Sequence, residues 1–304
     1  MADYITVDGG TTNTRLTLVK NGIPTDRVKY SVGARDGKAA LCEVLRDGIA
    51  SLLKGNSQSE ADIASVIASG MITSELGLVC LEHTVAPSGI SELQSTLFKC
   101  DLEEITSIPF AFIRGVKTDT TDLENADMMR GEETEIMGLF RGEGVYVLPG
   151  SHSKAVNVDS DGRITSFKTF MTGEMIAALS QNTILKDAVE LEGSEADADW
   201  LLKGYEYARK NGINEALFKT RVLKNRFGAD GKTTYSFFMG AVLSSEIDAI
   251  LKMNSPRVVL CGKAQLRIPT LELLSRLSES EIISVDDSDA EFASAVGAVR
   301  IFEN

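Results

Sequence analysis

The alternation of apolar and polar residues changes its period several times along the chain, and each change predicts an element of secondary structure. In the first part, short apolar runs and alternating stretches predict strands at 4–7, 15–20 and 27–32. A helix at 39–53 follows, because its leucine and isoleucine residues recur three or four positions apart. The apolar run 63–68 then predicts a buried strand.

The later part of the chain repeats this opening and then becomes mostly helical. Three strands are predicted at 145–148, 155–158 and 164–168. Helices are predicted at 174–184, 196–210, 215–225 and 235–252, followed by a strand at 257–261 and a closing helix at 290–302. The two openings share an order of elements, not a sequence, so they predict two α/β domains at 1–143 and 144–304. Packing of the closing helix against the first domain is an open alternative.

Composition narrows the range of functions. The chain has 304 residues and a net charge of −13, which argues against general binding to nucleic acid or to an anionic membrane. Its four cysteines and two histidines form no cluster with zinc spacing, and free thiols fit a reducing compartment. The N-terminus shows neither a basic nor an apolar targeting region, and no apolar run is long enough to span a bilayer. A cytoplasmic protein is expected.

The first chemical motif follows the first predicted strand. Asp8 ends that strand, and glycines and hydroxyl residues follow it in a turn whose N–H groups can hold phosphate oxygens. Asp8 is a candidate ligand of Mg²⁺, directly or through water, because Mg²⁺ prefers oxygen ligands. A plain glycine-rich hairpin is the alternative interpretation. The candidate phosphate ligands are Gly9, Gly10, Thr11, Thr12 and Asn13.

The second motif opens the second half in the same way. The segment 148–154 is a polar turn between two strands, and it ends in a cation that could neutralise phosphate charge. A decorated hairpin is again the alternative, but two such turns, one opening each half, are more specific than either alone. The candidate phosphate ligands here are Gly150, Ser151, His152, Ser153 and Lys154.

This pair of turns resembles the two phosphate loops of the actin/hexokinase/Hsp70 superfamily, and the chain more closely resembles the 2-dehydro-3-deoxygalactonokinase family. The matching segments, in the family's order, are 8–15, 69–74, 129–134, 148–154 and 171–174. They cover most of the chain, although 186–233 matches little. Leu78 stands where the family is expected to carry an aromatic residue, which bears on the sugar pocket and not on the phosphate chemistry.

The resemblance implies two ribonuclease H-like domains with a cleft between them, across which ATP binds together with Mg²⁺. The segment 129–135 is similar to a Gly-Glu-Glu segment of exopolyphosphatases, where a glutamate acts as the base. This similarity makes Glu132 and Glu133 candidates for the catalytic base, with Glu133 preferred. Arg130 is well placed to pair with an anionic substrate, since a guanidinium suits a carboxylate.

Two further segments complete the expected site. Gly262 ends the strand at 257–261 in a stretch that resembles the superfamily's adenosine loop, with Lys263 where many loops carry a second glycine. An ordinary strand-to-helix turn is the alternative. The expected sugar-binding residues are Arg130, Gly70, Met71, Thr172 and Glu174.

The expected function is ATP-dependent phosphorylation of 2-dehydro-3-deoxy-D-galactonate at its 6-hydroxyl, in galactonate breakdown. The alternatives are a kinase for a related keto-deoxy acid, or a nucleotide-binding sensor with little turnover on the same fold. The expected partners are a small acidic sugar and ATP, without nucleic acid or membrane. The oligomeric state stays open, with a homodimer as one alternative.

Overall fold

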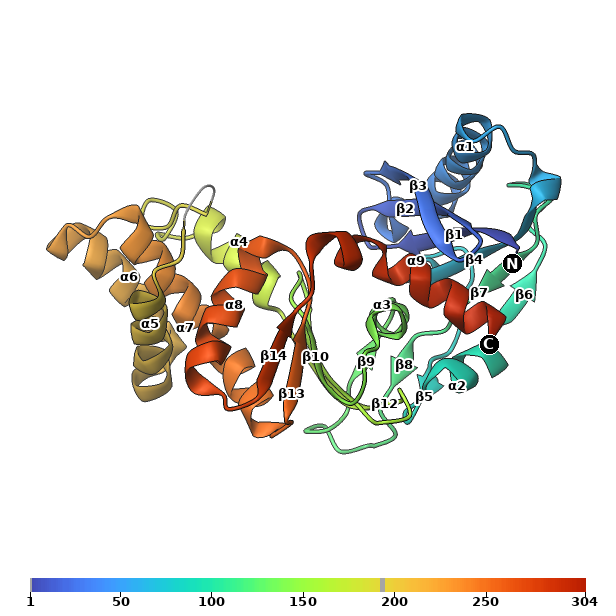
Figure 1. Cartoon of the computed structure of the whole chain (residues 1–304). Coiled ribbons are helices and arrows are strands. Elements are labelled where there is room, and N and C mark those ends of the chain that lie inside the picture. Colours follow the sequence, from blue (N-terminus) through green and yellow to red (C-terminus); the bar gives the residue numbers. More distant parts are fainter. Residues whose placement is uncertain (1, 192–194) are drawn as a thin grey trace. The chain divides into compact units, whose positions relative to one another are not determined.

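A computed structural model describes residues 2–191 and 195–304 of the chain. Two units emerge from the contacts between residues (Figure 1). Unit 1 comprises Met1–Glu143, Val158–Ser166 and Ser288–Asn304, and unit 2 comprises Gly144–Asn157 and Phe167–Asp287. The closing helix therefore belongs to unit 1 although it comes last in the chain.

Unit 1 is built on a six-stranded sheet with the order β3-β2-β1-β4-β7-β6. Its strands are β1 (Asp3–Gly9), β2 (Thr14–Lys20), β3 (Ile23–Tyr30), β4 (Ile63–Gly70), β6 (Phe98–Cys100) and β7 (Phe110–Phe112). Strand β1 is antiparallel to β2 and parallel to β4, with Gly9 opposite Gly70. The carboxyl ends of β1 and β4 therefore meet at the same edge of the sheet.

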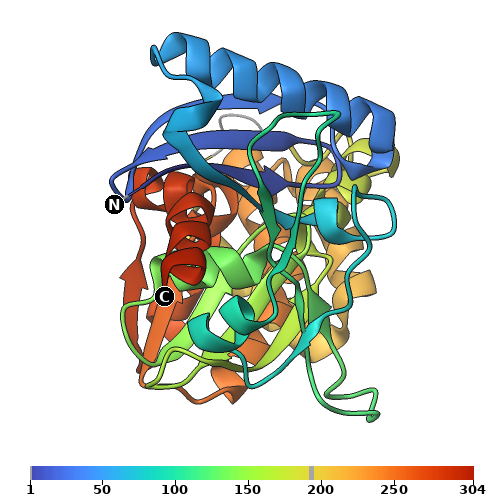
Figure 2. The ribbon, with the colours of Figure 1, turned by 90° about the vertical axis from the view of Figure 1, so that its right-hand side faces the viewer.

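The two faces of this sheet differ in chemistry because side chains alternate along each strand. Ile5, Val7 and Leu16 face the apolar core that includes residues of α1 (Lys38–Gly55). Tyr4 points to the other face, where its ring lies 5.4 Å from that of Phe302 in α9 (Asp287–Glu303). Figures 1 and 2 show α1 and α9 on opposite faces of the sheet.

Smaller elements complete unit 1. They are the helices α2 (Ile90–Ser95) and α3 (Glu132–Leu139), the 3₁₀ turns Ala34–Asp36, Glu60–Asp62 and Met71–Thr73, and a small sheet of β5 (Thr84–Val85), β8 (Val116–Lys117) and β9 (Met128–Met129). Helices α3 and α9 contact each other closely through glycines. A Cβ atom added to Gly297 would lie 1.8 Å from the carbonyl oxygen of Thr134. The C-terminal helix is thus fitted against the helix that begins with the Gly-Glu-Glu segment.

Unit 2 combines most of a five-stranded sheet, apart from Val158 and 164–166, with a helical layer. The sheet order is β12-β11-β10-β13-β14, formed by β10 (Gly144–Leu148), β11 (Ser153–Val158), β12 (Ile164–Phe170), β13 (Arg257–Leu260) and β14 (Glu281–Ser284). The helices are α4 (Thr172–Asn182), α5 (Ala198–Asn211), α6 (Ile213–Phe227), α7 (Gly231–Lys252) and α8 (Ala264–Leu277). Helix α7 is largely buried, and its Phe238, Met239 and Leu243 lie in the core with Val145 and Val258 of the sheet.

The predicted strands and helices are confirmed in kind and order, with differences at their ends. Strand β3 begins at Ile23 and not at residue 27, so it includes Pro24. A proline is tolerated there because β3 is the edge strand of the sheet. The strands β6, β7 and β14, the six-residue helix α2 and the small sheet were not predicted, since segments this short carry little periodicity. No helix within 2–191 or 195–304 is long and apolar enough to cross a membrane.

Candidate active site

Three of the sequence motifs meet at the carboxyl edge of β1 and β4 in unit 1. Gly70 has a φ of +85°, and a Cβ atom there would lie 2.5 Å from the carbonyl oxygen of Gly9. Gly131, directly before α3, would bring a Cβ atom within 3.3 Å of the Cα atom of Gly70. Side chains are excluded from these contacts, so the backbones of the three motifs lie against one another. Met71 begins the 3₁₀ turn that follows Gly70.

The first turn exposes its N–H groups because its carbonyl groups are held elsewhere. The carbonyl oxygens of Gly10 and Thr11 accept hydrogen bonds from the N–H groups of Ala34 and Arg35, both at 3.0 Å. In the described part of the chain, the N–H groups of Thr11, Thr12 and Asn13 donate to no protein acceptor. Successive free N–H groups in a turn form an anion-binding concavity. The geometry therefore suits the phosphate role expected from the sequence.

Asp8 stands beside this turn and is not a free carboxylate. Its Oδ2 atom lies 2.6 Å from Nη1 of Arg15, the residue opposite it on β2. Both side chains are partly exposed. No group of three or more His, Cys, Asp or Glu side chains suited to a metal ion occurs among the described residues. A Mg²⁺ ion held by one or two carboxylates together with water and substrate phosphates would need no such group.

The two candidate bases at the start of α3 differ sharply in burial. Glu133 is fully buried, and both its oxygens accept the N–H group of Gly131, at 2.9 and 2.8 Å. Burial, reinforced by the neighbouring charge of Glu132, raises the pKa of Glu133 to about 8. Glu132 is half-buried, and its Oε2 accepts the N–H group of Arg130 at 3.1 Å. Of the two, Glu132 alone retains solvent-exposed surface.

The guanidinium of Arg130 already has several protein partners. Its Nη1 atom donates to the carbonyl and hydroxyl oxygens of Thr73, at 2.8 and 2.7 Å, and its Nη2 atom donates to the carbonyl oxygen of Leu81 at 3.0 Å. The Nδ1 atom of His83 lies 3.4 Å from Nη2. Burial and the charges of Arg130 and Lys117 lower the pKa of His83 to about 4. Arg130 thus ties the segment after Gly70 to α3.

In the second turn, in unit 2, the carbonyl groups are again bonded to a neighbouring segment, as in the first turn. The carbonyl oxygens of Gly150 and Ser151 accept the N–H groups of Gly173 and Glu174, both at 3.2 Å. A Cβ atom on Gly173 would lie 2.4 Å from the carbonyl oxygen of Gly150, so α4 begins directly against the turn. The N–H groups of Ser151 and His152 donate to no acceptor in the described part of the chain.

The side chains of the second turn are less available than the sequence suggested. Lys154 is buried, and its Nζ atom donates to the carbonyl oxygen of His152 at 3.4 Å. Ser153 is fully buried, and its hydroxyl accepts the N–H group of Gly150 at 3.3 Å. The Nε2 atom of His152 lies 3.2 Å from Oε1 of Glu174. The positive charge of Lys154 therefore acts from beneath the turn.

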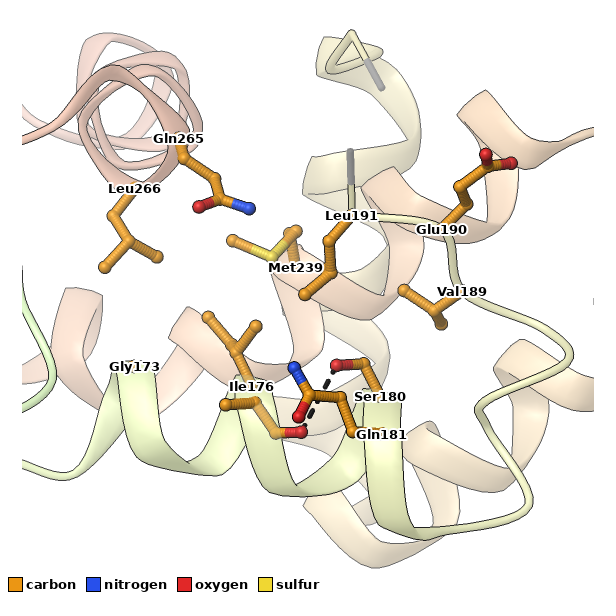
Figure 3. Close-up of a pocket in the computed structure, with 11 residues that line it drawn as sticks. Gly173, Ile176, Ser180, Gln181, Val189, Glu190, Leu191, Met239, Gln265 and Leu266 are labelled. Atoms are coloured by element: carbon orange, nitrogen blue, oxygen red, sulfur yellow. Dashed lines mark hydrogen bonds between the residues drawn. The ribbon is translucent and has the colours of Figure 1, made fainter. Parts of the chain in front are cut away.

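Gly262 packs against the start of the second turn. With φ at +97°, it would bring a Cβ atom within 2.8 Å of the carbonyl oxygen of Pro149. A cavity of about 510 Å³ lies nearby, between α4, α7 and the start of α8 (Figure 3). It is lined by Gly173, Ile176, Ala177, Ser180, Gln181, Val189, Glu190, Leu191, Met239, Gln265 and Leu266. Apolar side chains line most of it, and Figure 3 shows the amide of Gln265 directed into it.

The structure groups the predicted residues within each unit. Gly70, Met71 and Arg130 come together with Asp8 and the first turn in unit 1. Thr172 and Glu174, also predicted to contact the sugar, lie beside the second turn in unit 2.

Three side chains near these groups were missed by sequence reasoning: His83, Gln265 and Glu246, a buried acid of α7 bonded to Thr172. Glu246 left a signal, because it stands as a charged residue on the apolar side of a predicted helix.

Comparison with known proteins gives consistent matches. The model of the 2-keto-3-deoxy-galactonokinase family matches residues 8–299. A 2-dehydro-3-deoxygalactonokinase of Escherichia coli (strain K12) is 28% identical over 206 residues, which are 65% of this chain. That alignment spans 63% of the length of the E. coli protein.

Solved structures agree on the fold. The crystal structure of a Sinorhizobium meliloti protein, described as a candidate 2-dehydro-3-deoxygalactonokinase, matches with a TM-score of 0.77 at 22% identity and covers 98% of both chains. The activator of the 2-hydroxyisocaproyl-CoA dehydratase from Clostridium difficile, with bound ADPNP, matches with a TM-score of 0.54 at 12% identity, covering 99% of this chain and 94% of that one. The expected α/β fold of the sugar-kinase type is confirmed.

Proposed function

The chain belongs to the 2-keto-3-deoxy-galactonokinase family, and from this premise we propose that it transfers the γ-phosphoryl group of ATP to the 6-hydroxyl of 2-dehydro-3-deoxy-D-galactonate. The observation that carries the proposal is the family match over residues 8–299, which includes both phosphate turns and the Gly-Glu-Glu segment. A small acidic sugar and ATP are its proposed partners, and galactonate breakdown is its proposed setting.

The two turns are proposed to hold the phosphate groups of ATP. Each has its carbonyl oxygens bonded to a neighbouring segment and its N–H groups free, in Thr11–Asn13 and in Ser151–His152. Such turns bind anions without a surface cation, which suits a chain of net charge −13. The cavity beside Gly173 and Gln265 is proposed to take the adenosine, since its lining is largely apolar with a few polar groups.

Asp8 is proposed to hold Mg²⁺ through one carboxylate oxygen or through water. When bound, the ion would neutralise phosphate charge. Arg15 neutralises Asp8 in the present arrangement, so the metal would compete with the guanidinium for the carboxylate. The remaining roles belong to protein groups: the two turns bind phosphate oxygens, Arg130 orients the sugar-binding segment, and a glutamate removes the hydroxyl proton.

The base is proposed to lie in the pair Glu132 and Glu133. Sequence resemblance preferred Glu133, and its pKa near 8 suits proton transfer around neutral pH. Its complete burial, however, turns our preference toward Glu132, which a sugar hydroxyl can reach. Glu133 then fixes the N–H group of Gly131 and the start of α3.

Arg130 is proposed to orient the sugar-binding segment at Gly70 and Met71. Its bonds to Thr73 and Leu81 anchor that segment, which leaves its guanidinium less free for a substrate carboxylate than the sequence suggested. Loss of Arg130 should therefore raise the KM for the sugar through displacement of the segment.

The proposal is tested by measuring ADP release with a panel of substrates. The panel contains 2-dehydro-3-deoxygalactonate, other keto-deoxy acids and neutral sugars. Stimulation of ADP release by 2-dehydro-3-deoxygalactonate above all others supports the proposed activity. A stronger response to another keto-deoxy acid would replace the substrate, and ADP binding without any sugar-stimulated release would favour a sensor.

A further inference from the structure

Glu246 is a buried carboxyl group that lies beneath the proposed second phosphate turn. It belongs to α7 and is 1% exposed. Lys, Glu, Arg and Asp are almost never fully buried unless they are paired. In the described structure no ion pair involves Glu246, and its Oε1 atom has no hydrogen-bond partner. A burial this costly needs a reason beyond the packing of α7.

The hydrogen bond of Glu246 leads to the helix that abuts the turn. Its Oε2 atom accepts the hydroxyl of Thr172, the first residue of α4, at 2.5 Å. The carboxyl group of α7 therefore holds the first residue of α4.

Helix α4 connects directly to the turn. Its residues Gly173 and Glu174, which follow Thr172, donate their N–H groups to the carbonyl oxygens of Gly150 and Ser151. Displacement of the start of α4 would rotate the peptide groups whose N–H bonds are proposed to face phosphate.

The protonation state of Glu246 is compatible with a phosphate site above it. An ionised carboxylate beneath an anion-binding turn would repel phosphate. Burial raises the pKa of Glu246, against the opposing effect of the Thr172 hydrogen bond. The carboxyl group thus retains its proton at pH values where an exposed glutamate has lost it, and it can accept hydrogen bonds without a full negative charge.

We propose that Glu246 is a positioning residue for the second phosphate turn, acting through Thr172 and the start of α4 to hold the turn open for the phosphates of a nucleotide. The proposal rests on the proposed function, because it takes that turn as a phosphate site. It predicts an effect on the phosphates of the nucleotide and not on its nucleoside. A purely structural role would lower stability without this selectivity.

The test compares the affinities for ADP and for adenosine by calorimetry. Glu246→Leu removes the acceptor at similar volume and should weaken ADP binding by roughly tenfold, the effect of one or two lost hydrogen bonds. Adenosine affinity should stay within about twofold. Thr172→Val removes the donor at the same contact and should reproduce this selective loss, while Glu246→Gln retains an acceptor and should keep most of the ADP affinity.

Ser244→Ala is the matched control. Ser244 is also a buried polar residue of α7, but within the described residues its hydroxyl bonds only to the carbonyl oxygen of Ala241 in the same helix. This variant should change neither affinity. Measuring the ADP-to-adenosine ratio at equal fractions of folded protein separates positioning from general destabilisation. If Glu246→Leu does not fold, Thr172→Val carries the same test.

The outcomes distinguish failure of the positioning role of Glu246 from failure of the proposed kinase function. Selective loss of ADP affinity in Glu246→Leu or Thr172→Val supports the positioning role. An unchanged ADP-to-adenosine ratio in both variants overturns it and leaves the kinase proposal intact. If the parent protein binds neither ADP nor adenosine, the proposed function itself fails, and the role of Glu246 fails with it.

Discussion

Arg15 Nη1 lies 2.6 Å from Oδ2 of Asp8, across the antiparallel pair β1–β2 and beside the first proposed phosphate turn. The exposed fractions of the two side chains are 39% and 29%. An ion pair this exposed contributes little to stability, at most about 1 kcal/mol. The two residues can therefore be altered with small effects on the fold, and changes in activity can be interpreted directly.

Asp8→Asn should reduce phosphoryl transfer on the order of 10³-fold while the fold is retained. The physical reason is the loss of the single carboxylate proposed to position Mg²⁺. The measurement is kcat at saturating Mg²⁺, with circular dichroism to check folding. Arg15→Gln is the control, because it leaves the carboxylate in place and should cost far less. Near-normal turnover of Asp8→Asn would remove Asp8 from the metal site.

Glu132→Gln should slow transfer by roughly 10²–10⁴-fold, the usual effect of losing a general base, and should spare ATP affinity. Glu133→Gln should change kcat less, since Glu133 is fully buried in this structure. Single-turnover rates with ATP in excess separate chemistry from binding. A large loss in Glu133→Gln with little change in Glu132→Gln would reverse the assignment, and full activity in both would place the base elsewhere.

Lys154→Met should lower kcat/KM for ATP by roughly 10- to 30-fold, as expected for a lost hydrogen bond from a charged group. The variant removes the cation beneath the second turn and its bond to the carbonyl oxygen of His152. Steady-state kinetics with varied ATP provide the measurement. Lys168→Met, at an exposed lysine of β12, is the control and should be silent. Parent-like kinetics in Lys154→Met would exclude Lys154 from the phosphate site.

His83→Asn should reduce the loss of stability at acid pH. The pKa of His83 is about 4 in the folded protein, because of burial and the charges of Arg130 and Lys117, and it returns to about 6.5 on unfolding. A lowered pKa means that the unfolded state takes up the proton first, so stability is lost as pH falls from 6.5 through 4. Thermal unfolding between pH 7 and pH 4 should show a smaller decrease in Tm for the variant. Parallel curves would show that folding does not lower the pKa of His83.

Gly297→Ala should destabilise the protein by about 3 kcal/mol or more, because the added Cβ atom would lie 1.8 Å from the carbonyl oxygen of Thr134. The contact is between backbones, so no side chain can move aside. Urea unfolding gives the free energy. Gly231→Ala, at the start of α7 with nothing within 4 Å of its Cβ position, is the control and should be neutral or slightly stabilising. Equal stability in both variants would contradict the packing of α9 on α3.

The sequence predicted the turns better than it predicted the partners of their side chains. Glycines, hydroxyls and flanking strands are local features, so the segments at 8–15 and 148–154 could be found by inspection. Arg130 was predicted to face a substrate, yet its guanidinium bonds to the carbonyl oxygen of Thr73, 57 residues away. Nothing local to Arg130 indicates this contact, because it depends on how β4 and α3 come together.

Glu246 shows the same limit more clearly. Its partner Thr172 is 74 residues away, and the two meet only because α4 and α7 pack together in unit 2. The sequence places Glu246 three and four positions after the buried Leu243 and Val242, on the same side of the helix. This spacing indicates a buried acid but does not identify its hydrogen-bond partner. Periodicity predicts which side of a helix is buried, whereas the polar contacts on that side depend on the tertiary structure.

The assignment of Ser288–Asn304 to unit 1 has a consequence for biosynthesis. These residues leave the ribosome after everything in unit 2, whose last residue is Asp287. Until they emerge, the sheet face that carries Tyr4 has no C-terminal helix to cover it. Unit 1 therefore cannot complete its fold until α9 has been made. Strands near residue 4 thus wait for a helix that follows all of unit 2 in the chain.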